Sequence, residues 1–122
     1  MGDLLKKTKD AMGIKTSACD GEIAGLIDAG AHDLIAAGVR FTGTVSFEAT
    51  QSGITDNSTL TDNLVIRAII TYVRMLFRSP DDFDRLRAAY REQKGMLMHA
   101  SAYTDYDGSD DDGQGSDNQP DS

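Results

Sequence analysis

The chain has 122 residues, 39% of them hydrophobic, and a formal net charge of −8. This length allows one domain and a tail, and the single cysteine, Cys19, excludes an internal disulfide and a cysteine-based zinc site. The longest apolar run, residues 64–77, contains two arginines and is too short to span a bilayer. No apolar stretch of the signal-peptide kind follows Met1, so we expect a soluble protein of a reducing compartment.

The negative charge is concentrated at the C-terminal end. Residues 104–122 contain seven aspartates and no basic residue, a charge of −7, whereas residues 1–103 carry 13 acids against 12 bases, a charge of −1. The segment 104–122 also lacks aliphatic residues, so it cannot bury enough surface to offset the entropy of ordering it. The sequence predicts a nearly neutral folded domain, residues 1–103, and a disordered acidic tail, residues 104–122.

Two helices are predicted in the first third of the chain. Residues 3–12 form a short one that Gly13 ends. The second extends to Gly38, a residue type that suits a left-handed C-terminal cap. Its candidate N-caps are Thr16, Ser17 and Asp20. Its apolar stripe repeats at helical spacing over Ile23, Ile27, Ala31 and Leu34. A flanking face has only small side chains and predicts close packing against another helix: Gly25, Ala29 and Ala36.

Residues 39–61 break the helical period. Phe41, Val45, Phe47 and Ala49 alternate with polar residues, which is the period-2 pattern of a strand. Gly53 and residues 56–58 then predict a turn or loop. We therefore expect a long strand-like insertion over 39–61 within an all-α bundle of about four helices.

A third helix is predicted from a cap at Thr61 or Asp62 to about Phe77. Apolar residues cover most of its circumference and leave one polar stripe, which includes Thr71. Such a helix must be buried on several sides. Three other short helices offer little cover, so we expect part of its surface to contact another chain.

The fourth predicted helix has its N-cap at Ser79 and its first helical position at Pro80, and it fades near Ala102. Its inner stripe consists of Phe83, Leu86, Tyr90 and Leu97.

Basic residues at helical spacing are candidates for subunit or partner contacts. They form either a solvated face or a surface for an acidic neighbour, and both interpretations stand. Nucleic-acid binding is disfavoured because the domain as a whole is not basic. The third predicted helix carries Arg67, Arg74 and Arg78, and the fourth carries Arg87, Arg91 and Lys94.

The sequence predicts no catalytic, cofactor-binding or metal-binding residues. His32 and His99 are isolated, and no glycine-rich phosphate loop occurs. Residues 110–121 match an EF-hand loop in part, but they lack flanking helices and the final glutamate. A solvated acidic tail is the expected state, and we predict that the protein is not an enzyme.

Two blocks of sequence resemble the head–tail connector (adaptor, or DNA-packaging) proteins of tailed bacteriophages. The first is LLKKTKDAMGIKTSACDGEIAGLIDAGAHDLIAAGV, whose LIDAG matches the "LIDAA" helix of that family. The second is NLVIRAIITYVRMLFRSPDDFDRLRAAYREQKGMLMHASAY, in which Ala68, Tyr72 and Val73 match a recurring core. The insertion 41–60 and Gly21 depart from the family pattern.

This resemblance implies a virion protein of the phage neck, made in the bacterial cytoplasm, with no membrane and no cofactor. It implies a homo-oligomeric ring, a dodecamer, that binds the portal protein and head-completion or tail proteins. Double-stranded DNA would pass through the channel without sequence-specific binding. A closed ring requires two different complementary patches on each subunit. We expect the strand 41–50, with Val45 and Phe47, to be one of them, through pairing with a neighbour's strand.

A second hypothesis stands beside the connector. The chain would be a small helical regulatory or adaptor module with an acidic tail, which binds one partner protein through the third helix.

Overall fold

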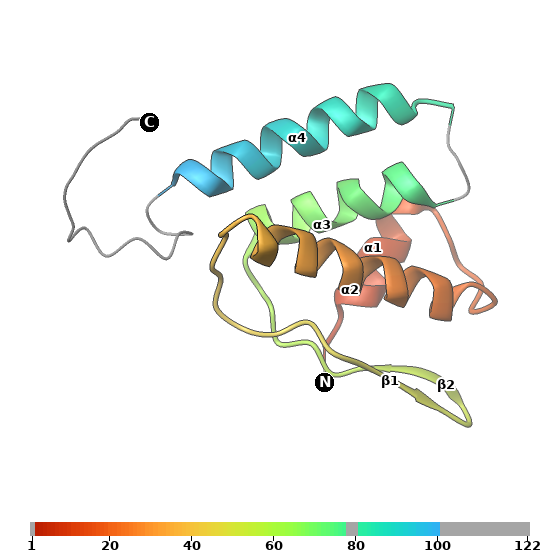
Figure 1. Ribbon diagram of the computed structural model, residues 1–122. Coiled ribbons are helices and arrows are strands. Elements are labelled where there is room, and N and C mark those ends of the chain that lie inside the picture. Colours follow the sequence, from red (N-terminus) through yellow and green to blue (C-terminus); the bar gives the residue numbers. More distant parts are fainter. Residues whose placement is uncertain (1, 78–80, 101–122) are drawn as a thin grey trace.

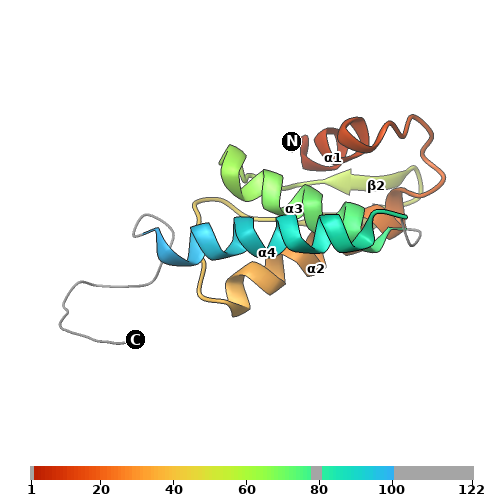
Figure 2. The same cartoon turned by 90° about the horizontal axis from the view of Figure 1, so that it is seen from above.

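The computed structural model describes residues 2–77 and 81–100, which form four helices and one β-hairpin (Figure 1). The elements in chain order are α1 (Leu4–Met12), α2 (Asp20–Ala36), β1 (Phe47–Thr50), β2 (Gly53–Asp56), α3 (Asn63–Leu76) and α4 (Phe83–His99). Helix α3 contacts each of the other three helices, and α1 also contacts α2. Seen from above, α4 lies along α3 (Figure 2).

The predicted helices are confirmed, with shifts at their ends. Gly13 ends α1 in the left-handed conformation, with φ 72°. Cys19, not one of the three predicted residues, occupies the N-cap position of α2, while Asp20 forms an ion pair with Lys9 at 2.7 Å. Helix α4 begins only at Phe83, after Asp82, rather than at the predicted cap. Ser79 and Pro80 lie outside the described residues, as does the predicted tail, residues 104–122.

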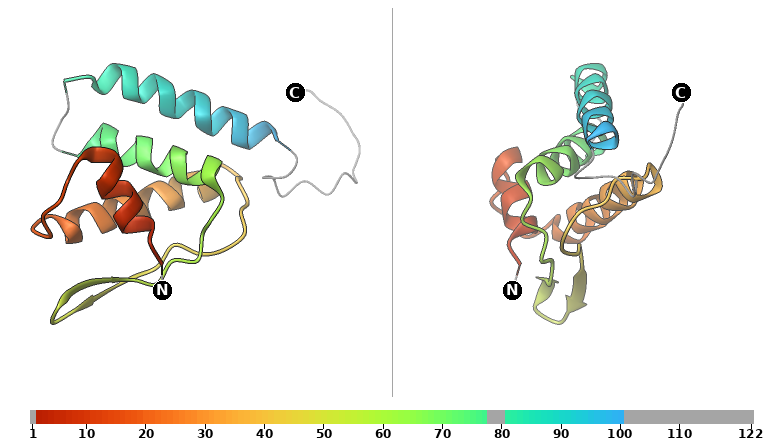
Figure 3. Two further views of the ribbon diagram at one scale, coloured as in Figure 1. Left: turned by 180° about the vertical axis from the view of Figure 1, so that it is seen from behind. Right: turned by 90° about the vertical axis from the view of Figure 1, so that its left-hand side faces the viewer.

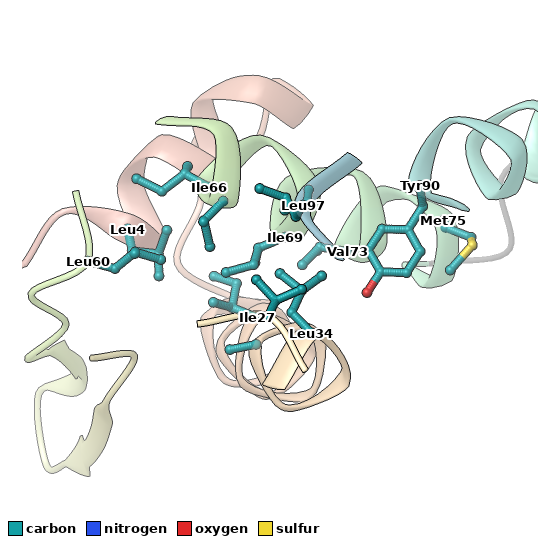
Figure 4. Packing of buried hydrophobic residues seen from close by; sticks show 14 of the residues in the cluster. Leu4, Ile27, Leu34, Leu60, Ile66, Ile69, Val73, Met75, Tyr90 and Leu97 are labelled. Atoms are coloured by element: carbon teal, nitrogen blue, oxygen red, sulfur yellow. The ribbon is translucent and has the colours of Figure 1, made fainter. Parts of the chain in front are cut away.

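The core is formed where the apolar stripes of α2 and α3 face each other. Ile27 and Leu34 of α2 and Ile69 and Val73 of α3 have no exposed surface (Figure 4). Leu4 of α1 and Leu97 of α4, together with Leu60 before α3, close the same cluster. The 3.6-residue period of each stripe therefore places one continuous apolar layer between the helices.

Helix α3 is covered more completely by its own chain than the sequence predicted. Seven of its 14 residues are buried, and one of them is Thr71, a member of the predicted polar stripe. The Thr71 hydroxyl donates a hydrogen bond to the carbonyl of Arg67 at 3.0 Å, which satisfies it inside the helix. Half of α3 is thus covered by its own chain, and contact of the remaining surface with another chain stays a prediction. Leu64 and Leu76, near its two ends, remain 50% and 42% exposed.

The insertion folds as an antiparallel hairpin, so its predicted strand-like character is confirmed in part, and the protein is mostly helical rather than all-α. Phe47 pairs with Asp56 and Thr50 with Gly53, which leaves a two-residue turn. Only residues 47–50 of the predicted strand 41–50 are β-strand, and their partner comes from residues predicted as turn or loop. The hairpin lies on the side of the molecule away from α4 (Figure 3).

Asp56 fastens the hairpin to the first helix. Its carboxylate accepts hydrogen bonds from the backbone N–H groups of Leu5, at 2.8 Å, and Ser58, at 2.9 Å. Its carbonyl accepts the N–H of Gly2 at 2.9 Å. The α1 N-cap residue, Asp3, makes no side-chain capping bond. Asp56 therefore caps α1 from a distant part of the chain, which explains why this carboxylate is buried.

Candidate assembly surfaces

The two arginines of α3 lie on its outward face. Arg67 and Arg74 are exposed, and neither guanidinium forms an ion pair within residues 2–77 and 81–100. Arg74 lines a shallow depression with Met12, Leu86 and Asp82, whose carboxylate is paired with Arg85. The third predicted arginine of this stripe, Arg78, lies outside the described residues. The outward face of α3 is thus a strip with uncompensated positive charge.

The basic residues of α4 lie on its other flank. Arg87 and Arg91 are exposed, and Lys94, which follows them at helical spacing, points toward α2 and binds Asp33 at 3.0 Å. Arg67 instead borders the flank of α4 that includes Glu92. The two predicted basic stripes therefore do not merge into one surface, and one member is already paired within the chain.

A polar cluster joins α2 to α4 around the Asp33 carboxylate. Asp33 accepts hydrogen bonds from the hydroxyl of Tyr90 and the ammonium of Lys94, and the same ammonium lies 5.2 Å from the centre of the Tyr90 ring. The rings of Tyr90 and Tyr72 meet edge to face with centroids 5.3 Å apart. Tyr72 in turn packs on Gly30 of α2, where a β-carbon would come within 3.0 Å of its ring.

The cluster shifts the pKa values of its members in opposite directions. Burial raises the pKa of Asp33, but the hydrogen bonds from Tyr90 and Lys94 outweigh it, so the pKa lies below the ordinary 3.8. Burial and the nearby Asp33 raise the pKa values of both tyrosines above 10.0. At neutral pH the cluster is therefore a carboxylate that accepts hydrogen bonds from a phenol and an ammonium, and it holds α4 against α2.

Low pH should weaken this contact between α2 and α4. A carboxylate whose pKa is lower in the folded chain stabilises it above the ordinary pKa of 3.8, and this contribution disappears as pH falls through the folded value. We expect Asp33→Asn to lower the free energy of unfolding at pH 7 by about 1 kcal/mol, since solvent screens a partly exposed pair. The difference from the native chain should shrink at pH 3.

Urea unfolding followed by circular dichroism at both pH values measures this difference. Glu92→Gln, which alters an exposed acid of α4, should change stability little at either pH. A constant penalty for Asp33→Asn from pH 7 to pH 3 would refute the electrostatic role of Asp33.

A groove of about 450 Å³ runs between the start of α3 and the second half of α4. Leu64 and Met96, which are 50% and 66% exposed, contribute apolar surface to it, and Arg67 and Glu92 lie on opposite walls. The side-chain oxygen of Gln93 is buried in this region without a hydrogen-bond partner in the described chain. Exposed apolar surface with an unsatisfied acceptor is typical of a surface that another molecule covers.

The hairpin residues predicted to bind a neighbour are half-buried. Val45 and Phe47 pack against the core cluster of their own chain. Their side chains therefore support the hairpin, and any strand pairing must use the backbone of β1. Hydrogen bonds from Asn57 to the Ser46 carbonyl, at 2.8 Å, and from Thr59 to the Thr44 carbonyl, at 2.9 Å, continue the ladder toward the helices.

Within the described ranges, no group of three or more histidine, cysteine, aspartate or glutamate side chains could hold a metal ion. No described helix is long and apolar enough to cross a membrane. Among the described residues, the polar partner of His32 is Asp28, through its backbone carbonyl at 2.8 Å and its carboxylate at 3.6 Å. The residues of the partial EF-hand pattern, 110–121, lie outside the described chain.

These features define a small, mostly helical protein with exposed arginines and an apolar groove on its surface. The family model described as phage connector protein matches residues 4–107. The chain therefore belongs to the phage connector protein family, as its sequence blocks indicated. Proteins of this family have a structural rather than a catalytic role and are associated with the virion. Comparison with curated proteins and with solved structures gave no match.

Proposed function

We propose that this protein forms a ring at the neck of the phage particle, between the portal vertex and the head-completion or tail proteins. The ring, a dodecamer by family resemblance, extends the channel through which double-stranded DNA passes without sequence-specific binding. The observation that carries this proposal is the family match over residues 4–107. Uncompensated arginines and an exposed apolar groove on a small domain support it, because such surfaces suit contact with other subunits.

The exposed arginines are the proposed contacts of the ring with neighbouring subunits or with the portal. Arg67, Arg74, Arg87 and Arg91 each present a guanidinium that can bind a partner carboxylate. Arg78 stays in the proposal on its sequence position alone. Lys94 would have to exchange Asp33 for a partner's carboxylate, so its contribution should be the smallest.

Light scattering after size-exclusion chromatography, combined with negative-stain imaging, tests the ring. The full chain is measured alone and after mixing with purified portal protein. Ring-shaped particles in either sample are the expected result. Monomers under both conditions would contradict the proposal, and a stable complex of one chain with one partner chain would favour the regulatory adaptor instead.

The outer edge of β1 is a further proposed contact, to a strand of a neighbouring subunit. In this hairpin register, the backbone groups of Phe47 and Ala49 point away from β2. The opposite edge of the hairpin is already occupied at Asp56, whose carbonyl binds Gly2. An exposed strand edge with unpaired N–H and C=O groups is a ready site for strand addition.

Ala49→Pro tests this edge without changing the intramolecular ladder. Proline removes an N–H that points outward, and edge positions tolerate it. We expect helicity like that of the native chain and ring assembly weakened at least about tenfold, since one strand contact is lost. Ala49→Thr, which keeps the N–H and favours strands, should assemble normally. Native-like assembly of the proline variant would exclude strand addition at β1.

A further inference from the structure

Two helices of the molecule carry opposite charge. Helix α2 contains four acidic residues and no lysine or arginine, whereas α3 contains two arginines and no acidic residue. Part of the acidic charge of α2 is used within the chain, because Asp20 binds Lys9 and Asp33 binds Lys94. Glu22 and Asp28 are exposed, and no lysine or arginine within the described ranges pairs with either.

The two uncompensated charges of α2 and those of α3 lie on opposite sides of the molecule. The helices pack on each other through Ile27 and Ile69, which are fully buried. Glu22 and Asp28 are exposed and lie about 120° apart around α2, one at each edge of its outer side. Arg67 lies about 200° around α3 from Ile69. The end-on view shows α2 on one side of α3 and α4 on another (Figure 3).

The basic side also has the apolar groove between α3 and α4. Arg67 lines this groove, and Arg74 continues the same face two turns further along α3. Leu64 and Met96 supply apolar area that water now covers. Among the described residues, Glu92 is the acid that lines the groove, and Asp82, which shares a depression with Arg74, is paired with Arg85. The basic side thus combines a hollow, apolar area and two arginines that form no ion pair within residues 2–77 and 81–100.

The acidic side of α2 includes small residues that its own chain leaves uncovered. Gly25 and Ala36, predicted from sequence to pack closely against a helix, are exposed, and no helix of the described chain covers them. A β-carbon added at Gly25 would meet nothing within 4 Å. Between its acids, the outer face of α2 therefore has the small side chains of Gly25 and Ala36 together with the exposed imidazole of His32.

We propose that the outer face of α2 in one copy of the chain lies in the α3–α4 groove of the next copy. Glu22 and Asp28 then face Arg67 and Arg74, and Met96 and Leu64 are covered. Because the two patches differ and lie on opposite sides, every copy offers one of each to its neighbours. This is the heterologous contact that a closed ring requires, and the inference rests on the proposed ring. Charge complementarity selects a second copy as the occupant.

A charge swap tests the pairing directly. One variant carries Arg67→Glu and Arg74→Glu, and the other carries Glu22→Lys and Asp28→Lys. Each variant alone would place like charges across every contact, so we expect its self-association to fall at least about tenfold. An equimolar mixture restores opposite charges at both kinds of contact, and alternating rings should form. Both variants should remain helical, because all four residues are exposed.

The possible outcomes separate this inference from the proposed ring. Assembly that is lost in each variant and restored by mixing supports the pairing of α2 with the groove. Rings of either variant alone as abundant as native rings, or no rings on mixing, would overturn that pairing and leave the ring itself intact. Absence of native rings rejects both proposals. Lys6→Glu with Lys15→Glu, two exposed lysines that do not line the groove, is the matched control and should assemble normally.

Discussion

Replacing Ile69 by alanine is expected to lower the free energy of unfolding by about 2–5 kcal/mol, the range for large-to-small changes in a packed core. Ile69 is fully buried on α3 and belongs to the cluster that α2 and α4 share. Truncation removes buried methylene and methyl groups and leaves a cavity that the surrounding helices can fill only in part. For a domain whose total stability is about 5–15 kcal/mol, this is a large loss.

Urea unfolding followed by circular dichroism measures the loss, and Leu64→Ala is the matched control. Leu64 lies in the same helix but is 50% exposed, so its truncation should cost below about 1 kcal/mol. Ile69→Ala should move the midpoint and leave the slope of the transition unchanged. Similar losses for the two variants would show that the centre of α3 is not the packed core of this fold.

The contrast between these two residues illustrates what periodicity can and cannot predict. An apolar repeat of 3.6 residues identified each helix and the buried stripe of α2, because helical geometry alone determines which side chains share a face. It did not reveal how fully α1, α2 and α4 cover α3, because cover depends on how helices pack. Leu64 and Ile69 are both large aliphatic residues of α3, and only the packing of the helices leaves the first exposed and buries the second.

The hairpin was half predicted for a related reason. Alternation revealed β1, since burial on one face imposes a period of two. The residues of β2 include Gly53 and Asp56, which are typical of turns, and tertiary contacts overrode that preference. Asp56 is held by the N–H groups of Leu5 and Ser58. No local pattern indicates a bond between residues 51 positions apart.

Charge positions were predicted better than charge partners. Helical spacing correctly grouped Arg87, Arg91 and Lys94 on one flank of α4. It could not show that Asp33 of α2 lies beside Lys94, because that pairing depends on how α2 and α4 sit against each other. The same limit applies to the proposed interface. Sequence showed the acids of α2 and the arginines of α3, but only the fold places them on opposite sides.

Replacing Gly43 by alanine should destabilise the chain by about 2–4 kcal/mol, because two costs combine at this position. Its backbone is in the left-handed region, with φ 96°, which side chains rarely adopt. A β-carbon would also lie 2.9 Å from backbone atoms of Leu60 and Thr59. Because backbone atoms cannot rotate away as a side chain can, the segment around residue 43 and the segment 59–60 would have to move apart.

Comparison with Gly53→Ala separates the clash of the added β-carbon from the cost of the backbone conformation. Gly53 also has a positive φ, 123°, but an added β-carbon there meets nothing within 4 Å. Its alanine variant should lose only the conformational part, about 1–3 kcal/mol. The excess loss in Gly43→Ala then measures the close approach of residues 43 and 60, and hydrogen exchange should show faster opening of the Thr59 and Leu60 amides, which bind the Thr44 carbonyl. Equal losses in the two variants would mean that an added β-carbon at residue 43 does not clash with the backbone of residues 59 and 60.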